Sequence, residues 1–163
     1  MAETHVLAPK PKAAPVEKAG VVRASPSHQA FLILHLGFTV APIVAGADKF
    51  MEKLTNWEMY LNPLAIKAIP VSPATFMHIV GVIEIIAGVV VLSKLTRIGA
   101  YVVTLWLIAI ALNLLTMGKF LDVAVRDLGL AVAAFSLAQL TAVREESTSR
   151  VRTGNAQPSL ARS

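Results

Sequence analysis

A lone carboxylate, Glu84, stands in an apolar stretch over residues 73–93 that holds no other formal charge. An ionisable side chain inside a membrane span is costly and usually faces the interior of a helical bundle, so it is a functional candidate. With a cationic partner the carboxylate stays charged, and without one it is neutral. Either state can hydrogen-bond a quinone or relay a proton. The alternative is a structural hydrogen bond between helices, with His78, Asn113 or Arg126 as the partner.

Other polar side chains lie toward one end of the neighbouring apolar stretches. Asp122 precedes Arg126 by four residues, which is the order that stabilises a helix, and Asp127 follows directly. The planar guanidinium of Arg126 can bridge to Asp127 or to Glu84. We predict one polar cluster in the outer half of the bundle, made of Glu84, His78, Asn113, Asp122, Arg126 and Asp127. This cluster is a ligand site, a proton site, or a charge network that only holds helix ends together.

The histidines and the lack of cysteine limit the cofactors. His35 lies about 9 Å from the inner boundary and His78 about 8 Å from the outer one, at a rise of about 1.5 Å per residue. In a hydrocarbon core of about 30 Å, about 13 Å then separates them, so a haem held by both is not expected. No histidine and glutamate have the spacing of metal ligands on one helix face, and iron–sulfur clusters need cysteine. We predict no metal and no covalently bound cofactor, with a quinone as the candidate ligand.

The composition predicts a membrane protein, in which each charged side chain within an apolar stretch is unusual. Of the 163 residues, 55% are hydrophobic and 15% are charged, and the mean hydropathy is +0.64. A soluble domain carries about 25% charged residues, so the chain is predicted to be an integral membrane protein whose first partner is the lipid bilayer. The net charge of +5 comes from the tails and short connections rather than from a patch interleaved with aromatic residues. No nucleic-acid partner is therefore expected.

Four apolar segments are long enough to cross a membrane, since a spanning helix needs about 20 such residues. The predicted spans are about 29–47, 73–93, 98–117 and 120–143. Ser72 and Pro73 are typical of a helix N-terminus at the second span. The predicted fold class is all-α, an integral membrane four-helix bundle over residues 29–143. Residues 1–28 are predicted to form a flexible N-terminal tail and residues 144–163 a polar C-terminal tail.

Basic residues predict the orientation of the bundle. An N-terminus in the cytoplasm places Lys10, Lys12, Lys18, Arg23, Lys94, Arg97, Arg144, Arg150, Arg152 and Arg162 inside, against Lys49, Lys53, Lys67 and Lys119 outside. This excess predicts that both tails are cytoplasmic. The long connection over residues 48–72 is either a helix that extends the first span or lies in the interface, or a packed outer loop.

Small residues repeat every four positions in the first span, at Gly37, Ala41 and Ala45. Small side chains let two membrane helices approach each other closely. This face is predicted to pack inside the bundle or against a partner subunit.

Three short motifs resemble those of one membrane-protein family. They are Gly46-Ala47-Asp48-Lys49-Phe50 at the end of the first span, Glu84 followed by Gly88, and the basic turn Lys94-Leu95-Thr96-Arg97 before Gly99. Over residues 29–143 the chain resembles the DoxX-like family of small bacterial membrane proteins. The resemblance implies a four-helix bundle in the bacterial cytoplasmic (inner) membrane and an association with redox systems, because one branch resembles the small subunit of thiosulfate:quinone oxidoreductase. It also implies that Lys49 and Glu84 are motif residues, whereas the charged start of the fourth span departs from the family pattern.

Three functions follow as hypotheses, and whether the chain is an enzyme stays open. The first is an accessory or anchoring subunit of a redox or respiratory-type membrane complex, whose partners are other membrane subunits or further copies of the chain. The second is a quinone-interacting oxidoreductase subunit with Glu84, Arg126 and His78 around a head group. The third is a small solute or proton transporter that uses the same cluster.

Overall fold

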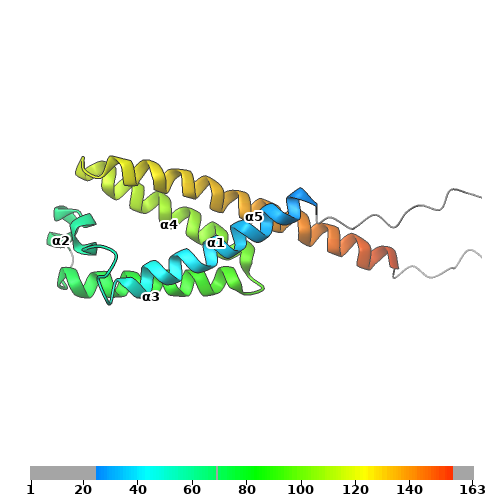
Figure 1. The fold of residues 1–163 in the computed structure, drawn as a ribbon, viewed down its shortest axis with the longest axis horizontal. Coiled ribbons are helices and arrows are strands. Elements are labelled where there is room, and N and C mark those ends of the chain that lie inside the picture. The colour runs from blue at the N-terminus through cyan, green and yellow to red at the C-terminus, as the bar shows by residue number, and fades with distance from the viewer. Residues whose placement is uncertain (1–24, 69, 156–163) are drawn as a thin grey trace, which may run out of the picture.

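The computed structural model describes residues 25–68 and 70–155, so most of the predicted N-terminal tail and the end of the C-terminal tail lie outside it. Every regular element in this part of the chain is helical, as predicted. The elements are α1 (Pro26–Asp48), the 3-10 helix η1 (Trp57–Tyr60), α2 (Pro63–Ala68), α3 (Pro73–Leu92), α4 (Thr96–Met117) and α5 (Leu121–Asn155). Four of them are long, and they form the body of the protein (Figure 1).

Two of the long helices begin with the same local device. The Ser25 hydroxyl accepts a hydrogen bond from the backbone N–H of His28 at the start of α1, and Ser72 does the same for Thr75 at the start of α3. A proline follows each serine and supplies a φ angle already suited to a helix. The helix start predicted at Ser72 is confirmed. At the C-terminal end of α4, Gly118 ends the helix with φ of +64°, a conformation that favours glycine.

The long helices pack as two antiparallel pairs, α1 with α3 and α4 with α5 (Figure 1). The pairs meet near the start of α1 and diverge toward α2 (Figure 1). All four helices contribute to one core, which consists of Phe38, Ala87, Val91, Ala100, Val103, Ala134, Leu137 and Ala138. Toward α2 a second core of Ala111, Leu114 and Ala124 involves only α4 and α5, with Tyr60 and Phe120 against it. The connection between α1 and α3 therefore packs where the pairs separate.

Three helices of the described chain, α1, α3 and α4, are long and apolar enough to cross a membrane. Their outer surfaces carry large apolar side chains such as Ile33, Leu36 and Leu105, which suit contact with lipid. The chain is thus a multi-pass, all-α membrane protein by the length and composition of these helices. The predicted span 120–143 is not among them and stays a prediction. It lies in α5, which has three charged residues near its start and continues as a helix through the polar residues up to Asn155.

The connection between α1 and α3 resolves an alternative that the sequence leaves open. It is a loop with two short helices rather than an extension of α1, because α1 ends at Asp48 and its backbone turns at once. Asn56 caps η1 by accepting the N–H of Glu58. Leu61, between η1 and α2, is buried at 8% exposure. The loop is therefore anchored to the bundle at defined points.

Candidate functional site

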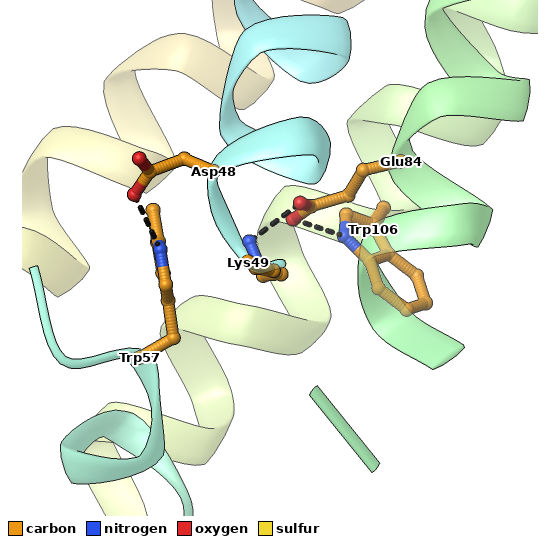
Figure 2. A network of polar contacts seen from close by, with 5 residues as sticks. All are labelled: Asp48, Lys49, Trp57, Glu84 and Trp106. Atoms are coloured by element: carbon orange, nitrogen blue, oxygen red, sulfur yellow. Dashed lines mark hydrogen bonds and ion pairs between the residues drawn. The ribbon is translucent and has the colours of Figure 1, made fainter. Parts of the chain in front are cut away.

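Lys49 and Glu84 form a buried ion pair. Lys49 directly follows α1, Glu84 lies in the middle of α3, and the Lys49 Nζ is 2.5 Å from the Glu84 Oε2 (Figure 2). Only 4% of Lys49 and 8% of Glu84 is exposed. A charged pair in such surroundings is little screened, so its geometry strongly affects the stability of the fold.

Glycines bring the two helices close enough for this contact. A Cβ atom on Gly46 would lie 2.5 Å from the carbonyl oxygen of Gly81, and one on Gly81 would lie 2.6 Å from the carbonyl oxygen of Gly46. Further along, a Cβ on Gly88 would lie 2.7 Å from the Ile43 Cγ1. Glu84 shares a face of α3 with Gly81 and Gly88, because residues three and four apart are neighbours on a helix. The carboxylate is thus aimed at the end of α1.

Two tryptophans flank the ion pair. The indole Nε1 of Trp106, on α4, donates to the Glu84 Oε1 at 3.4 Å (Figure 2). The Lys49 Nζ lies 3.7 Å from the ring centroid of Trp57, a cation–π contact. The ion pair and its two tryptophans therefore connect the end of α1 with α3, α4 and η1, elements that are far apart in the sequence.

Asp48 holds one of these tryptophans in place. Its carboxylate, 4% exposed, accepts hydrogen bonds from the Trp57 Nε1 at 2.8 Å and from the backbone N–H groups of Lys53 and Leu54 at 3.1 Å and 3.0 Å. These three donors satisfy the buried anion, and no ion pair joins it to a cation within residues 25–68 and 70–155. Asp48 thus closes the turn after α1 and orients Trp57 across Lys49 (Figure 2).

The structure does not gather the remaining residues of the predicted cluster around Glu84. His78 is exposed and stacks on Phe50 with ring centroids 4.9 Å apart, and Asn113 donates to the Tyr60 carbonyl at 2.8 Å. Arg126 donates to the buried Asp127 at 3.0 Å, which is the bridge that the sequence predicted as one alternative. Asp122 is exposed in the first turn of α5. Within the described residues, the hydrogen-bond partners of Glu84 are Lys49 and Trp106, not His78, Asn113 or Arg126.

Reasoning from the residues missed three members of this site: Asp48, Trp57 and Trp106. The resemblance alone pointed to Lys49. The contact between Asp48 and Trp57 does have a signal in the sequence, since a carboxylate at a helix end and a nearby indole N–H are natural hydrogen-bond partners. Trp106 carries no such signal, because its contact with Glu84 depends on how α4 crosses α3.

The arrangement is internally satisfied. Among the described residues, four charged side chains are buried: Asp48, Lys49, Glu84 and Asp127. Each has the polar partners given above. In the same part of the chain, no three His, Cys, Asp or Glu side chains are grouped closely enough to hold a metal ion.

Comparisons with protein-family models, with curated proteins and with solved structures find no match to this chain. The structure establishes a small all-helical protein with three candidate membrane spans. Its buried charged side chains join three long helices and a loop through hydrogen bonds and an ion pair. These features are the basis for a functional proposal.

Proposed function

We propose that the chain is a DoxX-like integral protein of the bacterial inner membrane and acts as an accessory or anchoring subunit of a redox or respiratory-type complex. Both termini face the cytoplasm in this proposal, and α5 supplies the fourth span. The observation that carries it is that the buried charged side chains bond to other groups of the protein. Lys49 pairs with Glu84, which also accepts from Trp106, and Asp48 accepts from Trp57. Groups so engaged suit a scaffold better than a catalyst.

A free face on α1 supports association with another subunit. A Cβ atom on Gly37 would meet nothing within 4 Å, and Ala41, one turn further on, is exposed. By contrast, Gly46 is in close contact with α3. Small residues on a membrane helix permit the close packing that drives association where lipid offers no hydrophobic preference. The small-residue face of Gly37 and Ala41 is therefore available to a partner helix.

The proposal predicts that a bulky residue at Gly37 disrupts a complex without disturbing the chain itself. The experiment purifies the tagged full-length protein from its native membranes in mild detergent and identifies its companions by mass spectrometry. We expect a stable complex for the natural chain and its loss for Gly37→Leu, with the helix content unchanged. Leu36→Phe is the control, because it enlarges a neighbouring side chain that is already exposed. Recovery of a single, partner-free species from the natural chain would contradict the proposal.

A quinone-interacting role is the second candidate. The Glu84 Oε1 accepts from the Trp106 Nε1 at 3.4 Å, which is long for a hydrogen bond, so this oxygen can accept a better donor such as a quinol hydroxyl. Under this alternative Glu84→Gln abolishes quinone reduction by the intact complex while the complex stays assembled. The proton-transporter alternative depends on the same carboxylate and predicts loss of proton flux into liposomes for that variant. Unchanged quinone reduction and unchanged flux would leave only the accessory role.

A further inference from the structure

An open groove of about 380 Å³ lies between the beginning of α1 and the second half of α5. Its volume is in the range of small-molecule sites, about 300–1,000 Å³. The side chains that matter for its chemistry are Phe31, Thr141, Arg144, Glu145, Thr148 and Arg152. The Lys49–Glu84 pair lies beyond the opposite end of α1, so the groove is separate from the candidate site.

The groove straddles the boundary between apolar and polar parts of the molecule. Its lining includes the aromatic ring of Phe31, in the second turn of α1, together with polar and charged side chains of α5. From Leu128 to Val143 the sequence of α5 holds no charged residue, and charged residues return at Arg144. A membrane protein places such a boundary at the level of the lipid head groups, where arginine side chains extend toward the interface.

Arg144 is held at this boundary by α1. Its guanidinium carbon lies 4.2 Å from the ring centroid of Phe31, and its Nη1 lies 2.7 Å from the His28 Nδ1. Arginine only donates hydrogen bonds, so the His28 Nδ1 is the acceptor. A guanidinium carries several N–H donors in one plane, and this single bond leaves others for an oxyanion.

The charges at the groove favour an anion. Glu145 is engaged by Arg97 from the start of α4, with the Arg97 Nη1 3.6 Å from its Oε2. Among the described residues that line the groove, Glu145 is the one acidic side chain, and this contact offsets its charge. Arg144 and Arg152 then give the groove a positive excess.

We propose that this groove binds the head-group phosphate of an anionic phospholipid, with Arg144 and Arg152 as its donors and the acyl chains leaving past Phe31. Basic pockets between membrane helices at the level of the head groups are suited to such lipids. A lipid fits better than free phosphate because Phe31 lines the groove beside the arginines and belongs to α1, whose surface exposes Leu32, Ile33 and Leu36. The lipid would bridge α1 and α5 at the end of the bundle where the two helix pairs converge.

Titration of the full-length protein in detergent with phosphatidylglycerol or phosphatidylcholine, followed by native mass spectrometry, tests this proposal. We expect one tightly bound phosphatidylglycerol and clearly weaker binding of phosphatidylcholine. Arg144→Gln should weaken phosphatidylglycerol binding about tenfold through the loss of a charged hydrogen bond. Arg152→Gln should weaken it about fivefold, as expected for one basic residue near an anionic lipid. Arg150→Gln is the matched control, because it removes the same charge from an exposed position outside the groove.

Three results would overturn the proposal. The first is equal binding of the two lipids. The second is a loss for Arg150→Gln as large as that for Arg152→Gln, which would indicate unspecific attraction to the basic helix. The third is displacement of phosphatidylglycerol by millimolar inorganic phosphate, which would assign the groove to the free anion. Should Arg144→Gln fail to fold, since this side chain also contacts His28 and Phe31, the comparison of Arg152→Gln with Arg150→Gln decides by itself.

Discussion

The two helix pairs are held together by different means. Between α1 and α3, glycines bring the backbones into contact and a buried ion pair joins the helices. Between α4 and α5, the contact is made by alanines together with Leu114 and Leu137, both fully buried. Both arrangements bury small side chains, but the first adds an ion pair that joins its two helices, whereas the buried Asp127 of α5 pairs with Arg126 of the same helix.

The connections explain this difference. The turn between α4 and α5 spans only residues 118–120, so it fixes how these helices lie against each other. The connection between α1 and α3 runs over residues 49–72 and leaves their relative position undetermined. In lipid, apolar packing discriminates poorly between alternative positions, because the surrounding acyl chains are equally apolar. The Lys49–Glu84 pair and the glycine contacts therefore supply the register that the long loop does not.

Breaking the ion pair should have the largest effect. Lys49→Met leaves the Glu84 carboxylate buried without its cation, so we expect the free energy of unfolding to fall by about 3–5 kcal/mol. The measurement is unfolding in mixed detergent and dodecyl sulfate micelles, followed by circular dichroism. Adding Glu84→Gln to this variant should recover much of the loss, because the unpaired charge is then gone. Glu145→Gln, which breaks the exposed pair with Arg97, should change stability by less than about 1 kcal/mol.

A double variant as unstable as the sum of its single variants would refute the coupling between Lys49 and Glu84. The Lys49–Glu84 contact would then not explain the difference between the α1–α3 and α4–α5 interfaces.

Glycine replacement should destabilise one pair by an intermediate amount and should not destabilise the other. In Gly81→Ala the added methyl group would meet the carbonyl of Gly46, so the helices must separate at a cost of about 1–3 kcal/mol. In Gly129→Ala, on α5, it would meet nothing within 4 Å, and the higher helix propensity of alanine should stabilise by up to about 1 kcal/mol. The same unfolding measurement compares them. Equal destabilisation by both variants would show that glycine contacts do not set the α1–α3 pair apart.

The smallest effect is expected for a polar contact between α4 and α5. Gln139 Nε2 donates to the Tyr101 hydroxyl at 3.0 Å, and both side chains are at least partly exposed. Tyr101→Phe removes this bond and should cost about 0.6 kcal/mol, the average for such bonds between membrane helices. A loss as large as that of Lys49→Met would mean that α4 and α5 also depend on a polar contact for their register.

Local signals in the sequence predicted most helices well. The spans expected at residues 73–93 and 98–117 correspond to α3 and α4 within a few residues, because apolar runs bounded by Ser72-Pro73 and by Gly118 carry their own start and stop signals. The sequence pattern predicted a polar tail from residue 144 and no helix there, whereas α5 continues to Asn155. It continues without a proline or glycine to interrupt it before Gly154, and the hydroxyls of Ser147 and Thr148 are satisfied by carbonyls of the preceding turn.

The candidate site was less predictable. Depth along the membrane placed several polar residues in the same half of the bundle, but depth does not specify the face of a helix on which a side chain lies. Asn113, for example, bonds to the loop rather than to Glu84. The true partners of Glu84 come from the end of α1 and from α4, and the crossing of these helices is set by contacts spread over the whole bundle.

By itself, the sequence determined the helical class, three helices able to span a membrane and the rarity of charge inside them, because hydropathy and helix signals act over neighbouring residues. Only the tertiary structure decided that Lys49 pairs with Glu84, that Asp48 holds Trp57 across this pair, and that Arg144 lies on Phe31. These contacts join residues far apart in the chain. Their energies depend on a close approach of backbones that glycine permits but does not by itself specify.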